Sequence, residues 1–204
     1  SLKPGFYKGE QTLKITAKDK NAKIYYTTNG SEPSPKSNLY TEEIIIKKNT
    51  PIRAAAFVEG EISSNITTAS YFIDEREINI PVVALVAEPE LIYGDSFGLI
   101  VTGVNGNIEI PSGCSDPLNN SYANYYNDWK HPSNFELFDA NDKEQINLEV
   151  RIGVYGSCSR TKRVKSLKVN ASKIFGENEF DYSIKKKKPN LRWKSVVLRN
   201  SGND

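Results

Sequence analysis

The sequence predicts a mainly β protein that contains two domains. Short apolar segments alternate with turn residues over residues 10–73, which is typical of a small antiparallel sandwich. The 204 residues include 11 Tyr and 8 Phe, and β-branched and aromatic residues favour strands over helices. A chain of this length can form two small domains that each bury a core. We therefore expect a β-sandwich at residues 1–74 and a second, β-rich domain at residues 75–204.

Turn residues mark the strands of the first domain. Residues 23–28 are expected to form a strand that ends at Asn29-Gly30, because both of these residues tolerate positive φ. Pro33 and Pro35 place the next segment in an exposed loop, since proline cannot donate to a strand ladder. Further strands are predicted at residues 43–47, 51–58 and 66–73.

The second domain begins with a short apolar run. Residues 80–86 are rich in valine and predict a buried strand, and a turn of helix is expected at residues 88–90. Another strand is predicted at residues 99–104 and a long irregular loop at residues 105–128. Residues 133–138 and 145–155 then predict a β-hairpin around the turn 139–142.

Charge is strongly segregated along the second domain. Residues 75–150 hold 3 Lys or Arg against 13 Asp or Glu, whereas residues 151–199 hold 14 against 3. Two interpretations remain open. The two blocks attract each other within the fold, or the basic block presents a cationic face to phosphate.

The stretch 153–168 is the strongest candidate for a binding site. It joins a glycine-containing turn to a run of cations, which is an arrangement that can hold an anionic group against backbone amides and basic side chains. The residues that we expect to face a phosphate are Arg160, Lys165 and Arg199, with Gly156, Ser157, Asn200 and Asp204 as supporting turn residues.

The two cysteines do not have the spacing of a zinc site or of a redox pair. We expect Cys114 and Cys158 to be free, partly buried thiols, with one disulfide between them as the alternative. The single histidine, His131, cannot form a histidine-rich metal site, and the sequence identifies no metal ligands.

Neither nucleic-acid binding nor a transmembrane helix is expected from the sequence. The run of lysines at residues 185–188 predicts a solvated loop, because it is not interleaved with a motif that reads nucleic acid. No apolar run approaches the length of about 20 residues that a transmembrane helix needs. The absence of any methionine suggests an excised piece of a longer precursor.

Residues 4–73 resemble the chitobiase/β-hexosaminidase C-terminal domain, an immunoglobulin-like module. The resemblance rests on the segment from Ile24 to Pro33, followed by Tyr40, Ile52-Arg53-Ala54 and Ser70-Tyr71. It implies an accessory β-domain of exported enzymes that has no catalytic residues of its own. Tyr25 and Tyr26 alternate faces, so one ring is expected in the core and the other at the surface. Either tyrosine is a candidate for stacking on a sugar.

Residues 80–204 resemble the first part of the CotH kinase family, which has an atypical protein kinase fold. The matching pieces include Pro81-Val82-Val83, Trp129, Phe135-Glu136-Leu137-Phe138-Asp139, Arg151-Ile152-Gly153, Gly156-Ser157-Cys158-Ser159-Arg160, Lys165-Ser166-Leu167-Lys168 and the segment from Leu198 to Asp204. The resemblance implies a β-rich α+β domain that is kinase-like but truncated, since members of the family continue well beyond the last of these motifs.

The two resemblances together imply an exported or cell-surface protein of bacterial type. Its parent would transfer phosphoryl groups from ATP to a protein substrate with Mg²⁺ or Mn²⁺, and this chain would not be active alone. The alternative is a non-catalytic adhesin or carbohydrate-binding module whose partner is a cell-surface glycan.

Overall fold

The computed structural model describes residues 2–116, 121–182 and 192–200, and its described part is mainly β. Two compact units divide the chain. The first consists of Ser1–Val86 and Asn134–Asn147, and the second of Ala87–Ser133 and Leu148–Asp204. The predicted boundary after residue 74 therefore falls inside the first unit, which also includes most of the predicted hairpin.

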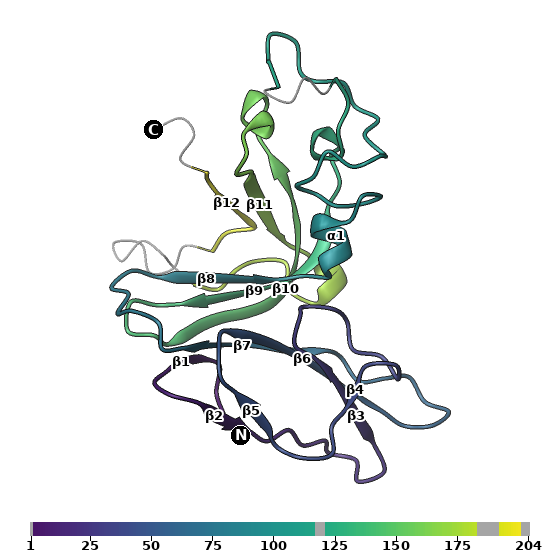
Figure 1. The fold of residues 1–204 in the computed structure, drawn as a ribbon, viewed down its shortest axis with the longest axis vertical. Helices are drawn as coiled ribbons and strands as arrows, with labels where there is room; N and C mark the ends of the chain where they lie inside the picture. The colour runs from purple at the N-terminus through teal and green to yellow at the C-terminus, as the bar shows by residue number, and fades with distance from the viewer. Residues whose placement is uncertain (1, 117–120, 183–191, 201–204) are drawn as a thin grey trace. The chain divides into compact units, whose positions relative to one another are not determined.

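The first unit contains a sandwich of two layers, as Figure 1 shows. The larger layer is a five-stranded sheet in the order β1-β7-β6-β3-β4, in which β1 runs parallel to β7. The smaller layer pairs β2 with β5 in antiparallel fashion. The strands are β1 (Gly5–Tyr7), β2 (Gln11–Leu13), β3 (Lys23–Thr27), β4 (Asn38–Leu39), β5 (Ile44–Ile46), β6 (Thr50–Phe57) and β7 (Thr67–Ile73).

Alternation along the strands gives the larger sheet two different faces. One face packs against the two-stranded layer through a core cluster of Leu13, Ile46, Ile52, Tyr71 and Ile73. Because side chains alternate along a strand, the residues between these core positions point to the opposite face. The predicted β-sandwich is confirmed for this unit.

An aromatic cluster covers part of the opposite face of the larger sheet. Phe6 and Phe72 stack with their ring centroids 4.5 Å apart. Phe138 approaches both rings edge-on, at 5.7 and 5.6 Å, and is fully buried. Edge-to-face contacts of this kind add to the stability that burial of the rings provides.

A buried carboxylate lies on the same face as this cluster. Glu136 has no exposed surface, and its carboxylate accepts hydrogen bonds from the backbone N–H of Ser70 at 2.9 Å and from the Ser70 hydroxyl. Burial raises the pKa of Glu136 above its ordinary value, and the two hydrogen bonds from Ser70 partly oppose that shift. The carboxylate thus ties β9 (His131–Phe138) to β7 within the first unit.

The second five-stranded sheet has the order β12-β11-β10-β9-β8. Its strands are β8 (Val82–Val86), β9 (His131–Phe138), β10 (Glu144–Tyr155), β11 (Ser166–Ala171) and β12 (Ser195–Leu198). One face of β10 and β11 is apolar, since Val150, Ile152 and Val154 are buried there together with Val169. The predicted hairpin and the predicted strand at residues 80–86 are both confirmed.

The described residues of the second unit include a short α-helix, α1 (Pro89–Tyr93), and the 3₁₀ turns η1 (Asn124–Tyr126), η2 (Cys158–Thr161) and η3 (Lys173–Phe175). The strand predicted at residues 99–104 is wrong. There the backbone N–H groups of Leu99 and Ile100 bond back to residues 91 and 92 instead of to a neighbouring strand. Gly103 then takes a positive φ of 59°, which ends any extended run.

Glu136 provides a pH-dependent test of the first unit. We expect Glu136→Gln to equal or exceed the wild type in free energy of unfolding at neutral pH. The amide carries no charge to desolvate, and it can still accept a hydrogen bond from the Ser70 N–H. The raised pKa means that the folded state binds the proton more tightly than the unfolded state does. The free-energy cost of burying the ionised carboxylate is therefore absent below the unfolded pKa of about 4.3. It develops as the pH rises through the folded pKa.

The measurement is urea unfolding of both proteins at several pH values, and the advantage of the variant should grow from about pH 4 to about pH 7. Glu136→Leu serves as the comparison, because it leaves the Ser70 N–H without an acceptor and should lose about 1–3 kcal/mol. If the Gln variant were as unstable as the Leu variant at neutral pH, the carboxylate charge itself would be required.

Candidate functional site

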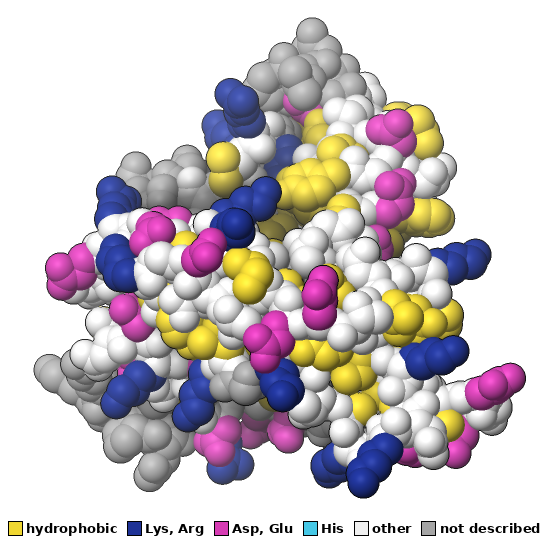
Figure 2. All heavy atoms as spheres, turned by 60° about the horizontal axis from the view of Figure 1, so that its bottom comes forward, with side chains coloured by type: hydrophobic (Ala, Val, Ile, Leu, Met, Phe, Trp, Pro, Cys, Tyr) yellow, Lys and Arg dark blue, Asp and Glu magenta, His cyan; other side chains and the backbone are white. Residues whose placement is uncertain are grey.

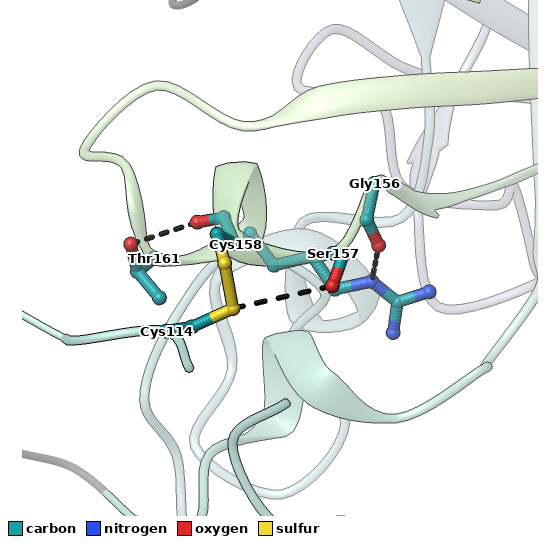
Figure 3. The surroundings of a disulfide bond; sticks show 6 residues. Cys114, Gly156, Ser157, Cys158 and Thr161 are labelled. Atoms are coloured by element: carbon teal, nitrogen blue, oxygen red, sulfur yellow. Dashed lines mark hydrogen bonds between the residues drawn. A yellow bond between two sulfur atoms is a disulfide. The ribbon is translucent and has the colours of Figure 1, made fainter. Parts of the chain in front are cut away.

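The basic turn, residues 153–168, connects β10 to β11 through η2. Gly156 has a φ of 113°, and a Cβ added to it would lie 1.9 Å from Ser159 Oγ. The positive φ therefore favours glycine at this position. Ser157 follows it and is exposed, with its hydroxyl 4.0 Å from Cys114 Sγ (Figure 3).

Arg160 holds the basic turn in place. Its guanidinium donates from Nε to the Gly156 carbonyl at 2.8 Å and from an η nitrogen to the Tyr126 carbonyl at 2.6 Å. The other η nitrogen binds Asp128 Oδ1 at 2.8 Å. The side chain is only 15% exposed. These three acceptors make Arg160 a clamp between the turn and residues 126–128, and its predicted contact with phosphate stays a prediction.

A disulfide joins Cys114 to Cys158, with a Cα–Cα distance of 5.0 Å (Figure 3). The expectation of free thiols is therefore wrong, and the alternative of a single disulfide is confirmed. Within η2, the Thr161 hydroxyl donates to the Cys158 carbonyl at 2.9 Å. The disulfide links the irregular segment 105–116 to the basic turn.

A buried carboxylate lies two residues beyond Cys114. Asp116 is 6% exposed and accepts hydrogen bonds from the hydroxyls of Tyr125 and Tyr126, the latter at 2.8 Å. Burial and the bond to Asp116 both raise the pKa of Tyr126. These three residues carry no signal in the sequence, because nothing in their spacing indicates that the chain folds back to bring Asp116 onto the two rings.

Lys165, one of the predicted phosphate contacts, lies beside Tyr125 and Asp116. Its Nζ lies 3.7 Å from the centroid of the Tyr125 ring, which is a cation–π contact. Burial lowers the pKa of Lys165, and the nearby Asp116 carboxylate opposes that shift. Two other cations of the turn, Lys162 and Arg163, are exposed.

The end of β12 lies beside the start of β11. Ser166 Oγ accepts from the Asn200 backbone N–H at 3.1 Å, and the Asn200 amide donates to the Val164 carbonyl at 2.7 Å. Asn200 thus contacts the basic turn, and its predicted support of a phosphate stays a prediction. Arg199 is exposed. Asp204 and the lysines at residues 185–188 lie outside the described residues.

The two predicted sugar-stacking tyrosines lie on opposite faces of β3. Tyr25 pairs with Ala55 in register and meets the Phe57 ring edge-on at 5.4 Å. Tyr26 meets the Tyr40 ring edge-on at 6.4 Å. Both tyrosines are half-buried, whereas we had expected one in the core and the other at the surface.

A cavity of about 890 Å³ lies within the first unit. Its lining is mainly aliphatic and includes Leu13, Ile24, Ile52, Ala54 and Ala56. Neither Tyr25 nor Tyr26 lines it. The cavity therefore offers no aromatic platform from the predicted tyrosines.

Three further features bear on possible partners. On the face that Figure 2 shows, Lys and Arg side chains are interspersed with Asp and Glu side chains. Among the described residues there is no helix that is long and apolar enough to cross a membrane. Nor do the described ranges contain a group of three or more His, Cys, Asp or Glu residues that could hold a metal ion.

Comparison with known proteins gives one match. Residues 2–68 match the chitobiase/beta-hexosaminidase C-terminal domain family, which covers less than half of the 204 residues. The resemblance of the first unit to that domain is thus confirmed for this segment. No curated protein and no solved structure matches the chain. The resemblance of residues 80–204 to the CotH kinase family has no support from these comparisons.

The disulfide is expected to contribute strongly to stability. Its cysteines are 44 residues apart, and closing a loop of that size stabilises a fold by up to about 4 kcal/mol in the chain-entropy model. The double variant Cys114→Ser with Cys158→Ser should therefore unfold at lower urea concentration than the wild type. A reducing agent should lower the wild-type midpoint and leave that of the double variant unchanged. If the reducing agent left the urea midpoint of the wild type unchanged, the thiols would be free.

Proposed function

We propose that this chain belongs to an exported, two-domain surface protein. An immunoglobulin-like module of the carbohydrate-associated type comes first, followed by a phosphate-binding domain of the CotH kinase type. The observation that carries the proposal is the basic turn, in which Lys162, Arg163 and Lys165 project from a support made rigid by Arg160 and a disulfide. A rigid cationic turn binds an anion at a lower cost in conformational entropy than a flexible one does.

The chemistry of the turn fits the phosphates of ATP. Lys162 and Arg163 are exposed cations, and the Lys165 ammonium is held over a ring beside a carboxylate. Phosphoryl transfer rests on positioning the phosphates and on neutralising their charge. We therefore assign phosphate contacts to these three residues. Arg160 positions the turn, since its guanidinium already binds three protein acceptors.

Metal ions that bridge the phosphates are part of such chemistry. In the described residues we find no group of acids in ligand arrangement to assign to Mg²⁺ or Mn²⁺. We propose that the acids that hold the metal belong to a longer parent chain. The part assigned to this chain is to hold the nucleotide, and the substrate of the parent would be a protein.

The disulfide also supports the proposed location. Disulfides form and persist in oxidising compartments, outside the cytosol. A cross-link between Cys114 and Cys158 fits an exported protein better than a cytosolic one.

A second candidate function is glycan binding without catalysis. The match of residues 2–68 to a domain named after chitobiase and hexosaminidase favours it. Tyr25 and Tyr26 would then supply stacking surfaces, since each ring is half-buried and fixed by an edge-on contact with another ring.

The nucleotide proposal predicts that the chain binds a fluorescent ATP analogue. Lys165→Ala should weaken the affinity by at least about tenfold, since a hydrogen bond to a charged group contributes about 1.5–3 kcal/mol. The affinity should also fall with added salt. Fluorescence anisotropy at several salt concentrations measures both effects.

Lys20→Ala is the matched control, because Lys20 is an exposed lysine of the first unit. It should bind the analogue as tightly as the wild type does. Absence of binding by the wild type, or equal losses in the two variants, would contradict the assignment of Lys165.

The glycan candidate predicts that chitohexaose binds to the first unit of the intact chain. Tyr25→Ala or Tyr26→Ala should weaken binding by about fivefold in isothermal titration calorimetry, since a well-placed aromatic contact contributes about 0.5–1.5 kcal/mol. The corresponding Phe variants keep the ring and should bind normally. Unchanged affinity in both Ala variants, with the fold intact by circular dichroism, would exclude the two tyrosines as a stacking site.

A further inference from the structure

Three aromatic side chains of the second unit form a cluster outside the basic turn. The Trp129 ring lies 5.8 Å from the Phe97 ring and 5.9 Å from the His131 ring, measured between centroids. Phe97 is 52% exposed, and Trp129 and His131 are half-buried. Exposed aromatic side chains that gather in this way mark interaction sites more often than they mark core packing.

The backbone holds the cluster rigidly. A ring nitrogen of His131, Nε2, is hydrogen-bonded to the Phe97 carbonyl at 2.8 Å. The Trp129 carbonyl oxygen lies only 2.5 Å from the position that a Cβ on Gly153 would occupy. Glycine in β10 therefore lets the main chain of Trp129 lie directly on the strand. Rings that are fixed in advance lose little conformational entropy when a ligand stacks on them.

Polar residues flank the rings in the sequence. Asn105 donates its side-chain amide to the carbonyl of Ser96, the residue before Phe97. Asp128, the residue before Trp129, has a side chain that is 77% exposed, and one of its oxygens binds Arg160. Lys130 on the other side of Trp129 is exposed.

This combination fits a sugar better than other ligands. A pyranose ring has an apolar face of C–H groups that stacks on an aromatic ring, and an edge of hydroxyls that bond to amides and carboxylates. The charges that flank Trp129 have both signs, since Asp128 is paired with Arg160 and Lys130 is exposed, so they select neither an anion nor a cation.

We propose that Phe97, Trp129 and His131 form a stacking platform in the second unit for a neutral saccharide chain. The ligand class rests on the proposed glycan-binding function, but the site is separate from Tyr25 and Tyr26. Glycan binding at one site can therefore be disproved without disproving binding at the other.

The two tryptophans allow a direct test on the full chain. Trp193 lies outside the cluster, where it stacks on Phe180 and donates to the Tyr182 carbonyl. In a Trp193→Phe variant, Trp129 is the single fluorescent tryptophan. Titration with chitohexaose, and separately with cellohexaose, should change its emission in a saturable way.

Adding Phe97→Ala to this background should weaken the affinity by at least about fivefold. Tyr155→Ala is the matched control, because Tyr155 is an exposed aromatic of the same unit at 46% exposure. It should leave the affinity unchanged, and so should Tyr25→Ala, which tests the first unit. Circular dichroism verifies that each variant is folded.

No change of Trp129 emission with either saccharide at millimolar concentration would overturn the proposal. A change that persists in folded Phe97→Ala would overturn it as well. Loss of binding with Tyr25→Ala and not with Phe97→Ala would place the glycan on the first unit alone.

Discussion

The disulfide between Cys114 and Cys158 is the constraint on which the candidate phosphate site depends. It fixes an irregular segment to the turn between β10 and β11. Two residues beyond Cys114, Asp116 accepts the hydroxyls of Tyr125 and Tyr126, and the ring of Tyr125 lies beneath the Lys165 ammonium. These contacts form a continuous series that connects the cross-link between two non-strand segments to the lysine.

A buried carboxylate has the corresponding role in the first unit. The aromatic cluster around Phe138 provides apolar contact, but only Glu136 gives the buried N–H of Ser70 a partner. Desolvation of the carboxylate opposes this contact, whereas loss of the acceptor would leave a buried donor unsatisfied. The hydrogen bond therefore fixes how β9 is aligned with β7 more than it adds stability.

Local patterns in the sequence predicted most of the strands and few of the contacts. Alternation in residues 145–155 and the valine-rich run 80–86 predicted strands correctly, because burial on one or both faces leaves a periodic signature. Residues 99–104 have similar composition, yet Gly103 and hydrogen bonds back to α1 keep them irregular. The partners of Asp116 were not predictable and the disulfide was predicted only as an alternative, since both result from long-range closure of a loop that has no period.

The cations of the basic turn show why a run of charge in a sequence does not by itself define a binding site. Arg160 and Lys165 were indistinguishable as predicted phosphate contacts. The guanidinium has several donors in a fixed planar fork, and three protein acceptors surround it. The ammonium is a compact charge on a flexible stem, and a ring holds it without using up its hydrogen-bond donors. Residue type and loop closure together therefore give the arginine a structural role, whereas a phosphate contact of the lysine stays a proposal.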